Sequence, residues 1–508
     1  MDWKKLQNGS DIRGVAMDGI EGEIVNLNPQ VASIIGRAFS QWLSHQSDKP
    51  ESQLKISLGR DPRITGHKLG MALSNGIQAG LAKVYDAGIA STPAMFMSTQ
   101  FNEYQMDGAI MITASHLPFN RNGMKFFTPS GGLEKRDISA ILELAEELKP
   151  VDRTEPIDES IDLMDRYSIH LREIISQGID TTTSKEKPLD GFKIIVDAGN
   201  GSGGFFATQV LEKLGADVKD SLFLEPDGMF PNHIPNPENS KAMQSIIEAV
   251  KMHKADLGII FDTDVDRAAF VDHNGNPVNR NKLIALVAAI ILERYPMSWI
   301  VTDSITSDGL TDFIHKNLRG SHHRFKRGYK NVINEGISLD RTGKECHLAI
   351  ETSGHAAIKE NQWLDDGAYL AAIIVVKMAK MKIEGNGELA DLINDLPLPL
   401  ESEEFRLKIL DEDFKESGGQ LLSSIEEYSE KMQGWSMVPN NYEGIRVKCD
   451  KHSGNGWFLL RMSLHDPVMP LNIESESDGG VELIREKLVD FFESKEGIDV
   501  SVLKNFKK

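Results

Sequence analysis

The stretch Gly108–Lys125, GAIMITASHLPFNRNGMK, places a serine and a histidine directly behind a short apolar run. The run Gly108–Ile112 predicts a buried strand. Residues typical of a loop follow it, at Pro118, Asn120, Asn122 and Gly123. Ser115 is then expected at the carboxyl end of a strand, where open α/β sheets place their chemistry. A serine in that position is a nucleophile, a phosphate carrier or simply an exposed turn residue.

The composition is typical of a multidomain globular protein. The 508 residues are 40% apolar and 26% charged, and the chain is too long for one hydrophobic core. The net charge of −20 argues against nucleic acid or an anionic membrane as the main partner. Two cysteines form no disulfide framework and favour a reducing compartment. We expect neither a membrane span nor a targeting segment in this sequence.

A strand, a polar turn and a helix recur in that order three times along the chain. The strands are expected at Leu54–Asp61, Phe192–Asp197 and Trp299–Asp303. The helices are expected from about Gly66, through Val210 and Leu214, and from Ser307. Three such units more than a hundred residues apart predict three similar α/β domains.

Charged or proline-rich connectors suggest where the domains end. The residues after about 396 lack the recurring unit and alternate presumed strands with helices, which predicts a small α+β domain. We therefore expect four domains, at residues 1–160, 161–275, 276–395 and 396–508.

Three aspartates at alternate positions follow the apolar residues Gly258–Phe261. In an extended segment, Asp262, Asp264 and Asp266 would present their carboxylates on one side. Carboxylates about 5 Å apart repel by roughly 3 kcal/mol per pair at an effective dielectric near 20, so we expect a cation among them. A site with only oxygen ligands and three carboxylates favours Mg²⁺. An EF-hand is excluded because Arg267 stands where its loop needs glycine.

Two further polar clusters follow predicted strands. Glu351–His355 (ETSGH) can hold sugar hydroxyls through directional hydrogen bonds. Arg461–Pro467 (RMSLHDP) combines an arginine, a hydroxyl and turn amides, which together can hold a phosphate dianion. Each cluster is ambiguous alone.

Three basic loops add positive charge to this acidic chain, at Gly9–Gly14, Arg60–Arg63 and Lys326–Lys330. The first two lie in the same expected domain as Ser115, where they could stabilise a transferring phosphoryl group. As isolated arginines they would be ordinary solvated residues.

In this order and spacing, the segments resemble the α-D-phosphohexomutase family, which comprises phosphoglucomutases, phosphomannomutases and phosphoglucosamine mutases. The four matching loops are Thr113–Lys125, Asp262–Arg267, Glu351–His355 and Arg461–Pro467. Supporting matches lie at Ser10–Gly14 and Pro226–Pro237. The resemblance implies three mixed-sheet α/β domains and a C-terminal α+β domain, of the TATA-binding-protein-like class, around a central cleft.

The same resemblance implies a role for each matching residue. Ser115 would carry a phosphoryl group and join Asp262, Asp264 and Asp266 around Mg²⁺. The residues implied around the phosphoryl group are Arg13, His116, Lys125 and Arg267. Either Lys125 or His116 would move the proton of the sugar hydroxyl. The residues implied to bind substrate are Tyr329, Lys330, Glu351, Ser353, His355, Arg461, Ser463 and His465.

The implied reaction interconverts hexose 1-phosphate and hexose 6-phosphate, of glucose or mannose, through a phosphoserine enzyme. Hexose 1,6-bisphosphate would be the intermediate and activator. The implied partners are small sugar phosphates, without nucleic acid or membrane. We expect a monomer or weak homodimer in the cytoplasm or plastid stroma.

Some loop residues depart from the family pattern. Leu117 stands where asparagine is usual, and Leu464, His465 and Asp466 replace the middle of the phosphate loop. Such changes bear on efficiency and sugar choice more than on fold. The pairing of His-Leu-Pro with Leu-His-Asp-Pro resembles a branch from plants and photosynthetic microbes.

Other activities fit parts of the sequence. Phosphoglucosamine mutase is one, and a weakly active sugar-phosphate-binding paralogue is another. A third is a haloacid-dehalogenase-type phosphatase, in which Asp262 would be phosphorylated and Asp264 would act as acid and base. That enzyme would leave the serine, sugar and phosphate loops without a purpose.

Overall fold

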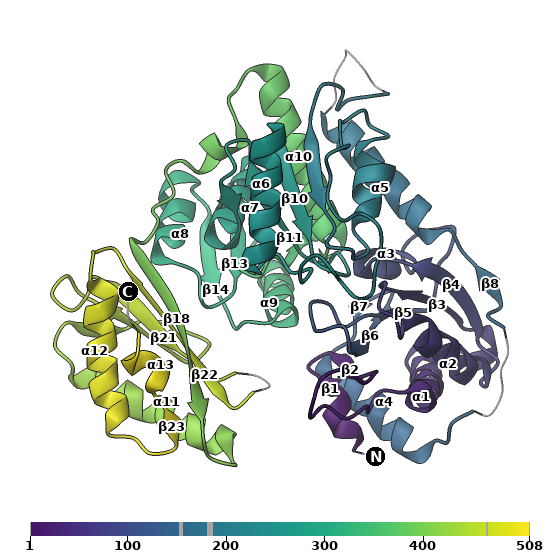
Figure 1. The fold of residues 1–508 in the computed structure, drawn as a ribbon, viewed down its shortest axis with the longest axis horizontal. Coiled ribbons are helices and arrows are strands. Elements are labelled where there is room, and N and C mark those ends of the chain that lie inside the picture. Colours follow the sequence, from purple (N-terminus) through teal and green to yellow (C-terminus); the bar gives the residue numbers. More distant parts are fainter. Residues whose placement is uncertain (1, 152–155, 180–185, 464–465, 507–508) are drawn as a thin grey trace. The chain divides into compact units, whose positions relative to one another are not determined.

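The computed structural model describes residues 2–151, 156–179, 186–463 and 466–506. They separate into two compact units. Figure 1 shows the helices and strands of the chain with their labels. The first unit holds residues 1–283 and 353–392, and the second holds residues 284–352 and 393–508. Within the described ranges, no helix is both long and apolar enough to cross a membrane.

The first sheet of the first unit is mixed and carries Ser115 at one strand end. Its strand order is β1-β2-β6-β5-β3-β4-β8, with β7 beside β6. The strands are β1 (Gln7–Asn8), β2 (Asp11–Val15), β3 (Lys55–Arg60), β4 (Lys83–Ile89), β5 (Gly108–Ile112), β6 (Arg121–Thr128), β7 (Gly131–Gly132) and β8 (Glu159–Ser160). Strand β5 runs parallel to β3 and antiparallel to β6. The apolar run predicted as a strand is therefore β5, and all five of its residues are buried.

Amphipathic helices cover this sheet and form its hydrophobic core. They are α1 (Pro29–Ser47), α2 (Gly66–Gln78) and α4 (Lys135–Glu147), with the shorter elements η1 (Trp3–Leu6), η2 (Glu51–Gln53) and α3 (Thr92–Met97). Side chains of α1, α2 and α4, such as Phe39, Leu73 and Ile141, share one buried cluster with Ile110 of β5. This packing fixes the strand end that leads to Ser115.

A second mixed sheet in the same unit carries the aspartates. Its order is β12-β11-β10-β9, with β9 parallel to β10 and the other pairs antiparallel. The strands are β9 (Ile194–Asp197), β10 (Leu257–Phe261), β11 (Ala268–Asp272) and β12 (Pro277–Val278). The flanking helices are α5 (Leu163–Ile179), the π-helix η3 (Phe206–Leu211) and α6 (Ser240–His253). The three aspartates lie in the connection from β10 to β11.

The next α/β portion contributes elements to both units, and α7 (Arg280–Arg294) leads into it. In the second unit, β14 (Ser321–Arg324), β13 (Trp299–Thr302) and β15 (Cys346–Ile350) are parallel. Their helices are α8 (Asp308–Asp312), the π-helix η4 (Phe313–Asn317) and α9 (Tyr329–Arg341). The first unit contains an antiparallel hairpin of β16 (Ala356–Ile358) and β17 (Leu364–Asp365). The short helix η5 (Lys359–Asn361) connects these two strands, and α10 (Gly367–Glu384) follows β17. The turn η6 (Leu389–Ile393) follows.

The rest of the second unit is an antiparallel sheet with helices beside it, in green and yellow in Figure 1. Its order is β19-β20-β21-β22-β18-β23. The strands are β18 (Glu401–Ile409), β19 (Trp435–Met437), β20 (Ile445–Cys449), β21 (Gly456–Leu460), β22 (Val468–Ser475) and β23 (Ile498–Asp499). The helices are α11 (Phe414–Lys431), α12 (Gly480–Glu493) and α13 (Ser501–Lys504). The predicted fold class, three mixed-sheet α/β domains and a C-terminal α+β domain, is confirmed.

Two local predictions are wrong. The loop expected through Gly123 ends earlier, because β6 already begins at Arg121. A Cβ on Gly123 would lie 2.3 Å from the carbonyl oxygen of Ile12, so this glycine marks a close approach of two strands and not a turn. The helix expected through Val210 and Leu214 is the short π-helix η3, and Leu214 lies in the turn behind it.

Candidate active site

Ser115 lies just beyond β5, in a conformation that few residues other than glycine adopt. The residue is 3% exposed, and its hydroxyl donates to Asp262 Oδ2 at 2.9 Å. Its N–H donates to Thr113 Oγ1 at 2.8 Å, and its φ is +51°, in the left-handed region. The exposed turn serine that the sequence alone allowed is therefore excluded.

Arg267 connects the aspartate loop to the serine loop. Its Nε and Nη2 both donate to Asp262 Oδ2 at 3.2 Å. The same Nη2 lies 3.3 Å from Ser115 Oγ and 2.8 Å from His116 Nδ1. Burial, together with the charges of Arg267 and Arg13, lowers the pKa of His116 to about 3. His116 is therefore neutral near pH 7, and its Nδ1 accepts a hydrogen bond from Arg267.

The three aspartates are buried, and one carboxylate oxygen from each lies within 4.8 Å of the others. They converge because the chain turns, whereas the sequence predicted an extended segment. The N–H of Val265 donates back to the carbonyl of Asp262 at 3.3 Å, and Val265 has a φ of +67°. Such a φ is rare for a β-branched residue and is found where the surrounding structure enforces it.

Lys125 and Thr92 hold the aspartates from the side of the first sheet. Lys125 Nζ donates to Asp264 Oδ2 at 2.9 Å and also to Asp266 Oδ2. Thr92 Oγ1 donates to Asp264 Oδ2 at 2.5 Å, and the Thr92 N–H donates to the carbonyl of Asp264 at 2.8 Å. These hydrogen bonds fix Oδ2 of Asp264, and they thereby fix the direction in which Oδ1 points.

The cluster suits a divalent cation. Asp264 Oδ1 and Asp266 Oδ1 are buried and have no hydrogen-bond partner within the described part of the chain. Burial and the neighbouring carboxylates of Asp266 and Asp264 raise the pKa of Asp262 well above its usual range. Burial also opposes ionisation of Asp266, but Lys125, His355 and Arg267 outweigh it and lower the pKa of that residue. Crowded carboxylate oxygens of this kind can bind a metal ion.

Three more predicted residues lie in this unit. Arg13 Nη2 donates to Asp11 Oδ2 at 2.9 Å, and its Nη1 lies 3.5 Å from the carbonyl of Ala114. His355 Nε2 lies 3.7 Å from Asp266 Oδ1, and its Nδ1 lies 3.0 Å from Ser353 Oγ. Ser353 and His355 therefore stand beside the aspartate cluster.

Glu351 belongs to the second unit, in a cluster of buried carboxylates. Its Oε1 accepts the N–H of Gly328 at 2.7 Å. Asp303 accepts the Thr352 hydroxyl at 2.6 Å and lies 3.6 Å from Arg327 Nε. Burial, followed by the negative charge of Asp303, raises the pKa of Glu351 to about 7. Near neutral pH its carboxyl group can therefore both accept and donate hydrogen bonds.

The remaining predicted residues also lie in this unit. Arg461 directly follows β21 and is 7% exposed. Burial, followed by the charge of Arg327, lowers the pKa of Arg461. Ser463 Oγ accepts the N–H of Asp466 at 3.3 Å. Tyr329 and Lys330 are the first two residues of α9, and Gly328, which has a positive φ, directly precedes them. His465 lies outside the described residues.

Comparison with known proteins identifies the family. Residues 4–151, 165–275 and 279–398 match the models of phosphoglucomutase/phosphomannomutase alpha/beta/alpha domains I, II and III. A phosphomannomutase/phosphoglucomutase of Pseudomonas syringae is 31% identical, over 94% of this chain and 92% of that protein. The chain belongs to the phosphoglucomutase/phosphomannomutase family. Members of this family are intramolecular phosphotransferases, and the chain is therefore an isomerase of this type.

Two further relatives support this assignment. A phosphoglucomutase/phosphomannomutase of Thermococcus kodakarensis is 30% identical, over 95% of this chain and 99% of that protein. The crystal structure of a phosphoglucomutase/phosphomannomutase family protein from Burkholderia thailandensis has a TM-score of 0.76 and 27% identity. The match covers 97% of this chain and 98% of that one.

Sequence reasoning missed Thr92, which contacts Asp264, and gave Arg63 the wrong role. Thr92 was not singled out, although it follows the helix-capping Ser91 in a Ser-Thr-Pro sequence. Arg63 was expected to face a transferring phosphoryl group, and this is wrong. Its guanidinium is buried against Asp61 and against backbone carbonyls of the serine loop. Every residue has a backbone carbonyl, so the sequence does not indicate which carbonyls Arg63 binds. Only the Arg-Asp-Pro-Arg pattern could have indicated that Arg63 has a structural role.

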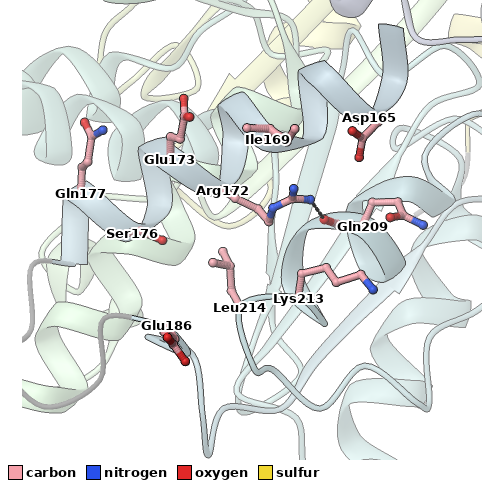
Figure 2. Close-up of a pocket in the computed structure, with 10 residues that line it drawn as sticks. All are labelled: Asp165, Ile169, Arg172, Glu173, Ser176, Gln177, Glu186, Gln209, Lys213 and Leu214. Atoms are coloured by element: carbon pink, nitrogen blue, oxygen red, sulfur yellow. Dashed lines mark hydrogen bonds between the residues drawn. The ribbon is translucent and has the colours of Figure 1, made fainter. Parts of the chain in front are cut away.

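A separate groove of about 480 Å³ lies between α5 and η3 (Figure 2). Arg172 reaches across it from α5 and donates to the carbonyl of Gln209 at 2.5 Å. The other charged lining residues carry both signs, namely Asp165, Glu173, Glu186 and Lys213. No predicted site residue lines this groove, and its mixed charge does not favour an anionic ligand such as a sugar phosphate.

Proposed function

We propose that the chain interconverts hexose 1-phosphate and hexose 6-phosphate, of glucose or mannose. The reaction runs through phosphorylated Ser115 and a hexose 1,6-bisphosphate, which also serves as activator. The observation that carries the proposal is the Ser115 hydroxyl, buried 2.9 Å from Asp262 Oδ2 beside Arg267 and His116. A serine confined in this way fits a carrier that is loaded and unloaded at one place.

The transfer needs a proton acceptor and balanced charge. The bond from phosphorus to Ser115 Oγ breaks while one forms to the sugar hydroxyl oxygen. The proton of that hydroxyl passes to Lys125 or His116 and from there to Ser115 Oγ, so that Ser115 ends as a hydroxyl. Arg267 and Arg13 orient the phosphoryl oxygens. Asp262, Asp264 and Asp266, with the phosphoserine, would hold Mg²⁺, which when bound neutralises part of the phosphoryl charge.

Most of the proposed substrate-binding residues belong to the second unit. Glu351, with Ser353 and His355 of the first unit, would bind sugar hydroxyls. Arg461, Ser463 and His465 would hold the phosphate that does not react. Tyr329 and Lys330 complete the proposed substrate-binding set. The intermediate reorients so that its other phosphate returns to Ser115.

We also propose the domain boundaries of the chain, the branch of the family to which it belongs and its place in the cell. The domains are proposed at residues 1–160, 161–275, 276–395 and 396–508. The motifs containing Leu117 and Asp466 support a place in a branch of plants and photosynthetic microbes. The protein is proposed to act in the cytoplasm or plastid stroma, as a monomer or weak homodimer.

Parallel assays with the 1-phosphates of glucose, mannose and glucosamine test this function. Each assay contains Mg²⁺ and a trace of the matching 1,6-bisphosphate. Turnover of glucose or mannose 1-phosphate to the 6-phosphate supports the proposal. Turnover of glucosamine phosphate alone would assign a phosphoglucosamine mutase. Tight binding of all three without turnover would contradict enzymatic function and indicate a sugar-phosphate-binding protein.

Arg461→Ala is expected to raise KM about 10- to 100-fold, while kcat changes less than about threefold. A hydrogen bond to a charged group is worth about 1.5–3 kcal/mol, and the phosphate held by Arg461 is not the one transferred. The measurement is steady-state kinetics with glucose 1-phosphate. Arg406→Ala is the control, because Arg406 is 68% exposed on β18 and pairs with Glu404. A fall in kcat with unchanged KM would contradict the proposed role of Arg461.

A further inference from the structure

Arg63 has every donor of its guanidinium occupied. Its Nη2 donates to the carbonyls of Ser115 and Leu117 at 2.5 and 2.6 Å. Its Nη1 donates to the carbonyls of Pro118 and Arg121 at 2.6 and 3.0 Å. Its Nε donates to Asp61 Oδ2 at 3.1 Å. A guanidinium has five N–H groups, so none remains for a substrate.

The four carbonyls span the whole turn between β5 and β6. Ser115 and Leu117 lie in the connection that follows β5, which ends at Ile112, and Arg121 is the first residue of β6. One planar cation thus holds both ends of the serine loop at a fixed separation. Arg63 is itself 2% exposed, so solvent does not compete for these hydrogen bonds.

Asp61 ties Arg63 to the backbone of Ser115 by a second route. Its Oδ1 accepts the N–H of Arg63 at 3.0 Å, and its Oδ2 accepts the hydroxyl of Thr113 at 2.7 Å. Thr113 Oγ1 in turn accepts the N–H of Ser115 at 2.8 Å. Both the N–H and the C=O of Ser115 are therefore fixed by this network.

The segment from Asp227 to Phe230 covers Arg63 from the neighbouring domain. The Phe230 ring lies over the guanidinium, with its centroid 5.2 Å from Arg63 Cζ. A Cβ on Gly228 would lie 2.3 Å from the carbonyl oxygen of Pro62 and 2.9 Å from Arg63 Cα. This close contact requires glycine and keeps Arg63 away from water.

Ser115 needs such support because its left-handed φ is unfavourable for a residue with a Cβ. In an unsupported loop, the chain would relax toward an extended conformation. The Ser115 hydroxyl would then no longer point at Asp262, 2.9 Å away.

We propose that Arg63 is a positioning residue, which holds the Ser115 loop in the left-handed conformation that aims the Ser115 hydroxyl at the aspartate cluster. The inference rests on the proposed phosphoryl transfer through Ser115. Arg63 touches neither substrate nor the reacting oxygen; it acts through the peptide carbonyls on either side of them.

Arg63→Lys tests this role because lysine keeps the charge but has one nitrogen, which cannot reach four carbonyls and Asp61. We expect kcat to fall at least 50-fold while KM stays within threefold. Amide hydrogen exchange in residues 115–121 should accelerate at least tenfold, whereas exchange in β3 should not change. Arg166→Lys is the matched control, because half-buried Arg166 belongs to the same unit, pairs with Glu103 at 3.0 Å and has no proposed part in the site. It should change neither quantity more than twofold.

Three outcomes separate the inference from the proposed function. Active wild-type protein with Arg63→Lys within threefold in kcat and unchanged loop exchange would overturn the role of Arg63 alone. If the wild-type protein is inactive but Arg63→Lys still accelerates amide hydrogen exchange in the loop, the proposed function is overturned. The same result supports the inference that Arg63 holds the loop. If Arg63→Lys does not fold, Asp61→Asn decides. It should lower kcat between 3- and 30-fold at constant KM and accelerate loop exchange, and no change in either would overturn the inference.

Discussion

Ser115→Ala is expected to lower kcat for glucose 1-phosphate by at least about a thousandfold, which corresponds to about 4 kcal/mol of lost transition-state stabilisation. The substitution removes the oxygen that is proposed to carry the phosphoryl group and leaves the rest of the cluster in place. Turnover is measured by coupling formation of the 6-phosphate to its oxidation. Substrate affinity, measured by calorimetry, should change less than about threefold, because Ser115 makes no proposed contact with the bound sugar.

Ser98→Ala is the matched control for this loss. Ser98 is as buried as Ser115 and belongs to the same unit, but its hydroxyl lies 2.7 Å from Ser57 Oγ, outside the site. Its substitution should leave kcat within about twofold, with a free energy of unfolding lowered by about 1 kcal/mol. Equal and mild effects of the two substitutions would contradict the role of Ser115.

Removal of divalent metal is expected to lower activity at least about a hundredfold, and Mg²⁺ should restore it. Three carboxylates whose oxygens gather within 4.8 Å are opposed mainly by Lys125 and Arg267. Neutralising the phosphoryl charge as well requires a further cation. The measurement is turnover after dialysis against a chelator, followed by titration with Mg²⁺.

Asp264→Asn locates the metal requirement within the chain. It should raise the Mg²⁺ concentration for half-maximal activity at least about tenfold, because a neutral amide is a weaker ligand for a hard cation. Asp272→Asn is the control, since Asp272 is also buried but accepts hydrogen bonds from its own turn, at Asn274 and Asn276. Full activity of chelator-treated protein would contradict the assignment of the aspartates.

The sequence predicted the fold where the signal is local. The apolar run Gly108–Ile112 is β5 with unchanged bounds, because five buried residues between polar ends leave little choice of structure. The helix expected from Ser307 begins there as α8, which Ser307 caps by accepting the N–H of Leu310 at 3.1 Å. The predicted catalytic residues Ser115, His116 and Arg267 also lie beside the three aspartates predicted to bind metal, since each of them follows the end of a strand.

The features that sequence reasoning missed depend on contacts between distant residues. Arg63 binds carbonyls more than fifty positions away, and a carbonyl has no side-chain identity to read. Thr92 meets Asp264 across 172 positions. The turn at Val265 went unpredicted because valine normally favours an extended backbone. It adopts a positive φ only where the surrounding fold requires it.

Mapping the phosphorylated residue tests the central claim most directly. The protein is incubated with glucose 1,6-bisphosphate and Mg²⁺, quenched, digested and sequenced by mass spectrometry, with Ser115→Ala as the control. Phosphate on Ser115 of the wild-type protein, lost on addition of glucose 6-phosphate, is the result that the account predicts. An acylphosphate on Asp262, with Ser115 unmodified, would contradict it and assign a phosphatase instead.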